Sequence, residues 1–164
     1  MKSVLALVNK QDDCMRKEFE KWVVLTYSNN RAVINEKKDA DKGVDGVAYL
    51  FVGADEYKKV ILSVKSGNVG SAFMRDLRGT IAREEAACGI LITLEEPTKP
   101  MHQEAREAGQ FKSDYLPPLD RLQIVTVQEI LDGSRMQLPL VAEVTKRAQK
   151  SKVDSGQTHL FANE

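Results

Sequence analysis

Two residues, Asp45 and Lys65, carry charged side chains that together could form a chemical site. Asp45 stands in the turn "KGVDG", where Gly43 and Gly46 let the backbone bend and leave the carboxylate uncrowded. Lys65 ends the run "VILSVK", which has the composition of a strand. If this strand pairs with the strand that follows the turn, the lysine comes to lie beside the aspartate. A carboxylate and an ammonium group held side by side could act together as one charged site.

Each of these residues also has a purely structural interpretation. An aspartate in a glycine-flanked turn is a common turn device. Side chains alternate along a strand, so Ser63 and Lys65 share one face. A lysine on an edge strand would simply reach water, whereas a lysine on a central strand is costly to bury without a partner. The two residues together on a hairpin are therefore a more specific pattern than either one alone.

Length and composition fit one soluble globular domain. The chain has 164 residues, of which 42% are hydrophobic and 29% charged, so it can bury a substantial core. It has no transmembrane run, and "VLALV" near the start is too short for a signal peptide. Cys14 and Cys88 stand apart, which indicates reduced thiols and a cytoplasmic location. With only His102 and His159 in the chain, a zinc site is not expected.

The distribution of charge is more informative than its total. The net charge is zero, with 24 basic and 24 acidic residues, so nothing global indicates nucleic acid. Basic residues nevertheless cluster before the aspartate turn, at the start of the lysine strand and on one predicted helix. These residues are Lys37, Lys38, Lys42, Lys58, Lys59, Arg75, Arg78 and Arg83. Most of them are interpreted as solvated surface, but DNA binding would need only some, Arg75, Arg78 and Lys42 in particular, on one face.

The apolar pattern predicts alternating helices and strands. Helical spacing is found in "QDDCMRKEFEKWVVLTYS", in "SAFMRDLRGTIAREEAAC", which Gly89 stops, and in a segment opened by Pro100 and closed by Gly109. Strands are predicted for "RAVINE", "GVAYLFVG", "KKVILSVKS", "GILITL" and "RLQIVT", and the second and third form an antiparallel hairpin. In "TVQEIL", Thr126 and Glu129 predict a capping box before a last short helix. This order predicts a mixed sheet with helices on both faces.

After Gly133, where the last helix ends, the composition changes. Residues 134–164 are polar and rich in Lys, Ser and Gln, and one helical turn is predicted near Ala142–Gln149. The sequence is therefore divided into a domain at residues 1–133 and a polar C-terminal tail at residues 134–164.

The order of an aspartate turn, a hairpin, an x-x-Lys strand, a helix and a further strand resembles the PD-(D/E)xK nuclease superfamily. Within it, "GVDG", "ILSVKSG" and "RDLRGTIAREEAACGILIT" are similar to the Mrr-type restriction endonuclease domain. The similarity is closer still to the nuclease-like C-terminal domain of certain modification DNA methyltransferases, which has counterparts of "EKKDADKGVDG", "SVKSG", "EEPTKPM" and "LQIVTVQEIL". The resemblance covers roughly residues 19–133. It implies a three-layer α/β/α restriction-endonuclease-like sandwich with a central mixed sheet, in the setting of restriction-modification.

The resemblance also implies a mechanism. In such domains carboxylates and a main-chain carbonyl hold Mg²⁺ or Mn²⁺, which generates hydroxide and screens the scissile phosphate. Carried over by position, Asp45 is a metal ligand, the carbonyl of Val64 is a main-chain ligand, and Lys65 stabilises charge on phosphorus. The implied activity is metal-dependent hydrolysis of phosphodiester bonds in DNA.

Ser63 departs from this pattern, because it stands where the family has a carboxylate. A hydroxyl is a poor Mg²⁺ ligand and has no charge. One account supplies a displaced carboxylate from the first helix, where Mrr-type domains have an "FE" pair and this chain has Phe19 and Glu20; Glu18 and Glu36 are alternatives. In a second account Ser63 orients a metal-bound water and catalysis is weaker. In a third the domain binds DNA without cutting it, and serine is a feature that the methyltransferase-associated domains share.

The partners that the resemblance implies are DNA, a DNA methyltransferase and a second copy of the chain, since cutting both strands needs two sites. The chain contains no DPPY-type motif and no FxGxG, so it is not itself a methyltransferase. It also lacks GxxxxGK[ST], so it is not a P-loop enzyme.

The tail ends in "GQTHLFANE", in which Gln157, Leu160 and Phe161 match the pattern QxxLF. This pattern resembles the short peptides by which bacterial DNA enzymes dock on the replicative sliding clamp. A glutamine for polar contacts and a Leu-Phe pair for an apolar pocket suit such docking. The alternatives are that the pair folds back on the domain or that the short match arose by chance.

Overall fold

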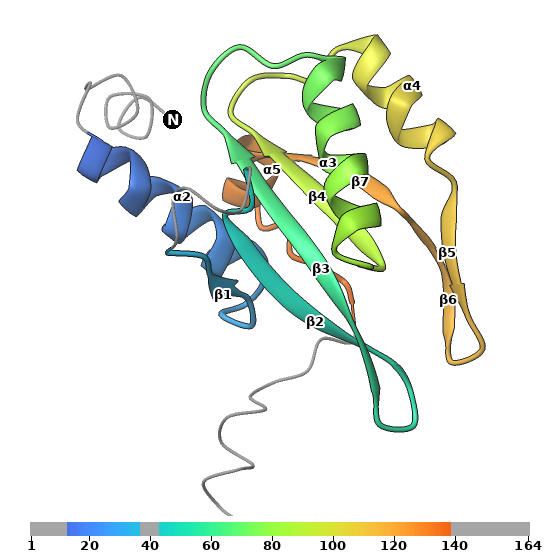
Figure 1. Ribbon diagram of the computed structural model, residues 1–164. Coiled ribbons are helices and arrows are strands. Elements are labelled where there is room, and N and C mark those ends of the chain that lie inside the picture. Colours follow the sequence, from blue (N-terminus) through green and yellow to red (C-terminus); the bar gives the residue numbers. More distant parts are fainter. Residues whose placement is uncertain (1–12, 37–42, 139–164) are drawn as a thin grey trace, which may run out of the picture.

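A five-stranded mixed sheet forms the centre of the protein (Figure 1). The computed structural model describes residues 13–36 and 43–138. The strands, in spatial order, are β1 (Val33–Ile34), β2 (Gly46–Gly53), β3 (Glu56–Lys65), β4 (Cys88–Thr93) and β7 (Leu122–Thr126). A separate two-stranded sheet is made by β5 (Gln110–Ser113) and β6 (Leu116–Asp120).

The predicted hairpin is present and places the two candidate residues at one end of the sheet. β2 and β3 pair antiparallel, with Gly46 opposite Leu62. β4 then pairs parallel to β3, with Lys65 opposite Thr93, and β7 pairs parallel to β4. The sheet is therefore mixed, as predicted, and β3 is a central strand, so Lys65 does not lie on an edge strand.

Helices cover both faces of the sheet, which makes three layers. α2 (Asp13–Tyr27) and α5 (Val127–Leu131) contact one another on one face, and α3 (Ser71–Arg83) and α4 (Lys99–Glu107) contact one another on the other. Figure 1 shows α3 in front of the strands and α5 behind them. The fold is an α/β/α sandwich, as the sequence predicted.

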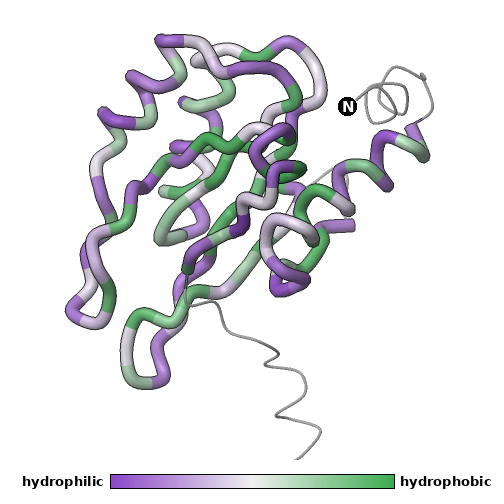
Figure 2. The backbone as a smooth tube through the Cα atoms, turned by 180° about the vertical axis from the view of Figure 1, so that it is seen from behind, coloured by the Kyte–Doolittle hydropathy of each residue, from purple (hydrophilic) through white to green (hydrophobic). Residues whose placement is uncertain are grey.

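Each face of the sheet has its own hydrophobic core. The alternate β3 residues Val60, Leu62 and Val64 belong to the core under α2 and α5, and Ile61 belongs to the core under α3 and α4. All six residues of β4 are buried, as expected for a parallel strand covered on both faces. Figure 2 shows the hydrophobic residues concentrated along these central strands.

The N-terminal end of α5 confirms the predicted capping box. The Thr126 side-chain oxygen accepts a hydrogen bond from the Glu129 N–H at 3.1 Å, and Glu129 Oε2 accepts one from the Thr126 N–H at 2.7 Å. The reciprocal pair satisfies two donors that a helix start leaves without intrahelical partners.

Two features differ from the sequence-based expectation. α3 ends at Arg83, and Glu85 adopts a positive φ of 52°, so Cys88 already belongs to β4. Gly89 is thus not a helix stop; a Cβ built there would lie 2.8 Å from Ile81 Cδ1, so the glycine lets α3 pack against the strand. The hairpin of β5 and β6 was not predicted, because two prolines, Pro117 and Pro118, interrupt its apolar alternation.

The first residues after Gly133 return to the domain. Met136 is buried in the core beneath α2, and its N–H donates to the Tyr27 carbonyl at 2.9 Å. The helical turn and the QxxLF motif predicted for the rest of the tail lie outside the described residues, as does the end of the tail itself.

Two further points concern the chain as a whole. Cys14 is exposed and Cys88 is buried, and the two do not form a disulfide with one another. Among the helices of the described ranges, none has the length and apolar character needed to cross a membrane.

We expect Thr93→Val to stabilise the protein by about 1 kcal/mol, because an unsatisfied buried hydroxyl carries a desolvation cost that a methyl group of similar shape avoids. Thr93 is fully buried, and its hydroxyl has no hydrogen-bond partner among the described residues. Thr80→Val is the matched control, since the Thr80 hydroxyl donates to the Asp76 carbonyl at 3.1 Å. Urea denaturation measures both variants; a less stable Thr93→Val protein would contradict the expectation.

Candidate functional site

Asp45 is held between two strands at the start of β2. Its N–H donates to the Leu62 carbonyl at 2.9 Å, and its carbonyl accepts from the Asn35 N–H at 3.0 Å. Its side-chain Oδ2 accepts from the Val64 N–H at 2.7 Å. The carboxylate therefore extends the β2–β3 ladder by one bond and is fixed beside the end of β3.

Ser63 and Lys65 open into one cavity between β3 and α3. The cavity has a volume of about 290 Å³ and is also lined by Gly43 and Phe73. Ser63 is buried, with 4% of its surface exposed. The Lys65 ammonium lies 5.5 Å from the centroid of the Phe73 ring, a distance suited to a cation–π contact. The lysine is thus positioned by an aromatic side chain from α3.

Gly43 lines this cavity and adopts a backbone conformation that disfavours a side chain. A Cβ at this position would lie 3.6 Å from Lys65 Nζ and 4.0 Å from Ser63 Oγ, and Gly43 adopts a φ of +84°. The glycine of the "KGVDG" turn is therefore required by its backbone conformation, and it brings the turn close to the lysine.

Glu20 approaches the same end of β3 from the opposite layer, on α2. Its carboxylate forms an ion pair with Arg16, with 3.5 Å between Arg16 Nε and Glu20 Oε1. Of the two alternatives to Glu20, Glu18 is exposed and pairs with Lys21 at 3.3 Å, and Glu36 is exposed. The charge of Asp45 acts on Glu20 and raises the pKa of the Glu20 carboxyl.

The pKa values of both carboxyl groups are raised. Burial, and then the charge of Asp45, raises the pKa of Glu20, while Arg16 and Lys65 lower it. Burial also raises the pKa of Asp45, against the hydrogen bond from Val64 and the charges of Lys65 and Arg16. Glu20, Asp45, Lys65 and Arg16 therefore form one electrostatic group at the end of β3.

The chemistry of this group fits a metal ion only in part. Two carboxylates are present, but Asp45 already accepts a hydrogen bond and Glu20 already pairs with Arg16. Within residues 13–36 and 43–138, no three acidic, histidine or cysteine side chains are grouped so that they could hold a metal ion. Metal ligation by the Val64 carbonyl stays a prediction. The hydrogen bond seen at Val64 is made by its N–H, which donates to Asp45 Oδ2.

The predicted DNA-binding residues have different surroundings. Arg75 links α3 to α4 through an ion pair with Glu104 at 3.0 Å, so this arginine has a structural partner. Arg78 is exposed on the same helix. Lys42 lies outside the described residues, and so do Gln157, Leu160 and Phe161 of the clamp motif. Arg16 was not predicted as a site residue, although its spacing of four from Glu20 on a helix is a signal for such a pair.

An α/β/α sandwich with an aspartate at the start of β2 and a lysine at the end of β3 defines a restriction endonuclease-like domain. Residues 15–132 match the family described as NACHT-associated inactive Restriction Endonuclease 1, and the chain belongs to that family. The match supports the restriction endonuclease-like part of the resemblance, but it does not extend to Mrr-type or methyltransferase-associated domains. No curated protein and no solved structure matches the chain significantly.

Proposed function

We propose that this protein is a restriction endonuclease-like domain that binds DNA without cleaving it. The observation that supports this most directly is the buried Ser63 hydroxyl at the position where a nuclease of this fold has its second carboxylate. A hard cation such as Mg²⁺ needs oxygen ligands that can balance its charge, and a neutral hydroxyl cannot replace a carboxylate in this role. The family description, with the word "inactive", points the same way.

The surroundings of the two carboxylates support the same proposal. Burial is the main cause that raises the pKa of both Asp45 and Glu20, so each charged form is less favourable here than in water. Arg16 forms an ion pair with Glu20, and its guanidinium would compete with a metal cation for the same carboxylate oxygen. Asp45 has a structural role, since its carboxylate satisfies the Val64 N–H.

The proposed binding to DNA rests on the cations at this end of the sheet and on α3. Lys65 and Arg16 lie at one end of the sheet, and Arg16 is more than half exposed. Arg78 adds an exposed guanidinium on α3, the helix that also carries Phe73. Phosphate contacts of this kind require no metal and give affinity that falls with salt.

The experiment measures binding and cleavage on the same preparations. We expect duplex DNA to bind in EDTA, and the slope of log affinity against log salt to fall by about one unit in Lys65→Ala. Lys112→Ala, an exposed lysine on β5, is the matched control and should keep the wild-type slope. Plasmid DNA, methylated and unmethylated, should stay intact with Mg²⁺ or Mn²⁺. Absence of DNA binding, or a Lys65→Ala slope equal to that of wild type, would contradict the proposal.

A second candidate function is metal-dependent cleavage of DNA. The observation that favours it is the electrostatic group in which Glu20 supplies a displaced carboxylate beside Asp45 and Lys65. In that case Asp45 and Glu20 would hold Mg²⁺ or Mn²⁺, Ser63 would orient water, and Lys65 would stabilise charge on phosphorus. Plasmid cleavage that disappears in both Asp45→Ala and Lys65→Ala would establish this function in place of the first.

The partners are proposed on separate grounds. The family description supports association with a NACHT module, and we extend that association to this chain. A DNA methyltransferase and an Mrr-type role in restriction-modification rest on the sequence resemblance alone. A sliding clamp rests on Gln157, Leu160 and Phe161, and a homodimer rests on the need for two sites in double-strand cutting. A cytoplasmic location agrees with the reduced thiols.

A further inference from the structure

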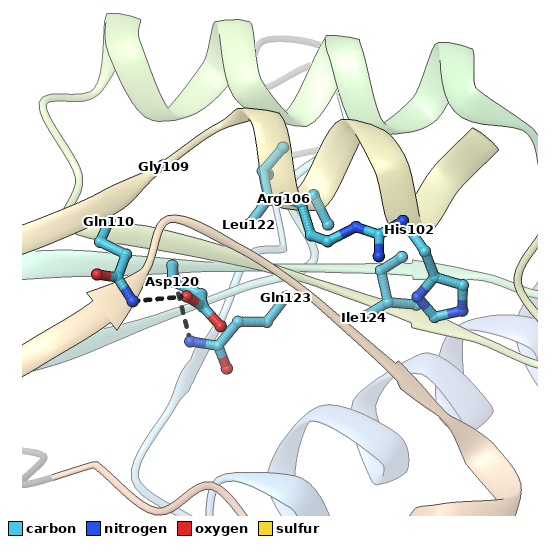
Figure 3. Close-up of a pocket in the computed structure, with 9 residues that line it drawn as sticks. His102, Arg106, Gly109, Gln110, Asp120, Leu122, Gln123 and Ile124 are labelled. Carbon is cyan, nitrogen blue, oxygen red and sulfur yellow. Dashed lines mark hydrogen bonds between the residues drawn. The ribbon is translucent and has the colours of Figure 1, made fainter. Parts of the chain in front are cut away.

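A second cavity lies at the β7 edge of the sheet, between α4 and β7 (Figure 3). Its volume is about 640 Å³, which is within the usual range for sites that hold small organic ligands. β7 is the last strand of the five-stranded sheet, so its outer edge has no strand partner in the described part of the chain. The cavity shares no lining residue with the Ser63 cavity.

One wall of this cavity offers hydrogen-bond donors from α4. His102 and Arg106 are four residues apart on that helix and lie side by side in Figure 3. Within the described ranges no carboxylate lies at ion-pair distance from Arg106, whereas Arg75 on α3 has a partner in Glu104. A guanidinium that faces a cavity without an acidic partner is suited to hold a phosphate.

The opposite wall carries amide and carboxylate groups. Gln110 Nε2 donates to Asp120 Oδ1 at 3.1 Å, and Gln123 Nε2 donates to the Asp120 carbonyl at 3.2 Å, as Figure 3 shows. These bonds fix the orientation of both amides. Each glutamine keeps a side-chain carbonyl that can accept, and Asp120 keeps a second carboxylate oxygen that can accept.

The floor between these two walls is apolar. Leu122 is buried, and Ile124 and Ala105 are partly buried and pack against the core under α3 and α4. A ligand that fills the cavity would therefore place an apolar or planar body on this floor. Its anionic end would lie at Arg106 and His102, and its polar edge would lie at Gln110, Asp120 and Gln123.

We propose that the cavity between α4 and β7 binds a phosphate ester of nucleotide size. A nucleoside monophosphate has the three required parts, namely a phosphate for Arg106, a planar base for the floor of Leu122 and Ile124, and a donor and acceptor edge for the amides and Asp120. Such a ligand can be a free nucleotide or the terminal nucleotide of a nucleic-acid strand. This site is separate from Asp45 and Lys65, so it adds to the proposed function and does not depend on it.

The test titrates the four common nucleoside monophosphates into ¹⁵N-labelled protein of the full chain and follows amide shifts by NMR. We expect shifts confined to α4, β7 and the β5–β6 hairpin for at least one of them, with weaker binding of the matching nucleoside and of inorganic phosphate. Arg106→Gln is expected to weaken the binding tenfold or more, because it removes a charge-assisted hydrogen bond. Arg31→Gln, an exposed arginine before β1, is the matched control and should leave the affinity unchanged.

A 5′-phosphorylated single-stranded oligonucleotide forms the second arm of this test. Tighter binding of the oligonucleotide, still weakened by Arg106→Gln, identifies a strand end as the source of the nucleotide; equal or weaker binding identifies the free nucleotide. The absence of amide shifts at millimolar concentrations of every probe overturns the proposal. So does binding that Arg106→Gln leaves unchanged in a variant whose amide spectrum shows the native fold. Loss of DNA binding in Lys65→Ala with nucleotide binding intact separates this site from the proposed function.

Discussion

Asp45→Asn is expected to be more stable than the wild-type protein at neutral pH, and Asp45→Ala is expected to be less stable. Asparagine keeps an oxygen that can accept from the Val64 N–H, and it removes a charge that burial disfavours. Alanine removes the acceptor as well, so a part-buried N–H loses its partner at a cost of about 1–3 kcal/mol. The free energy of unfolding should therefore be higher than that of wild type in Asp45→Asn and lower in Asp45→Ala. Urea denaturation at neutral pH measures both changes.

The same pair of variants tests the pH dependence. In the folded protein the pKa of Asp45 is raised from 3.8 and that of Glu20 from 4.5, so the folded state binds more protons than the unfolded state above these values. The contribution of these two groups to stability is therefore largest below pH 3.8 and falls as the pH rises through the raised values. Asp45→Asn should flatten this fall.

Glu84 has the opposite sign, because its hydrogen bond with Lys59 lowers the pKa of the Glu84 carboxyl. The comparison therefore uses the difference in the free energy of unfolding between variant and wild type at each pH. The contribution of Glu84 is the same in both proteins and cancels. Asp114→Asn, an exposed aspartate in the β5–β6 turn, is the control. An Asp45→Asn protein that is as unstable as Asp45→Ala at neutral pH would show that attraction to Lys65 outweighs the burial of the charge.

Gly89→Ala is expected to destabilise the protein by about 1–3 kcal/mol, because added volume in a packed core forces neighbouring groups to move. The new Cβ would lie 2.8 Å from Ile81 Cδ1 and 3.0 Å from Leu77 Cγ, both on α3. Ile81 and Leu77 are buried, so they have little freedom to give way. Thermal or urea denaturation gives the change in the free energy of unfolding.

Gly79→Ala is the matched control on the same helix. A Cβ at Gly79 would meet nothing within 4 Å, and the residue is exposed within α3. Alanine has a higher helix propensity than glycine, so this variant should be more stable by about 0.5–1 kcal/mol. If Gly89→Ala also stabilised the protein, α3 would have to sit further from β4 than the contacts indicate.

The fold could be predicted largely from periodicity, because its main elements bury one regular face. "GVAYLFVG" and "KKVILSVKS" alternate, and the structure pairs them as β2 and β3. α2 buries Phe19, Val23 and Tyr27 at helical spacing. The β5–β6 hairpin was missed because its strands are short, partly exposed and interrupted by prolines, so local pattern is weak and contacts with the core hold it.

The candidate site could be predicted only in part. The Asp45 turn and the Lys65 strand are visible in the sequence, because both lie on one hairpin. The approach of Glu20 depends on how α2 crosses the sheet, which no local pattern specifies, and it was expected only from the family resemblance. The cavity between α4 and β7 was not predicted, since its walls come from a helix, a strand and a hairpin that the sequence separates.

The bond from Met136 to Tyr27 gives the protein a mechanical property. The chain leaves α5 at Leu131, yet at residue 136 it is fastened to the last residue of α2 rather than to α5. A pull applied at residue 138 therefore reaches α2 first. α2 is also the helix that carries Arg16 and Glu20, so tension on this part of the chain acts on the element that supplies one side of the charged group around Asp45.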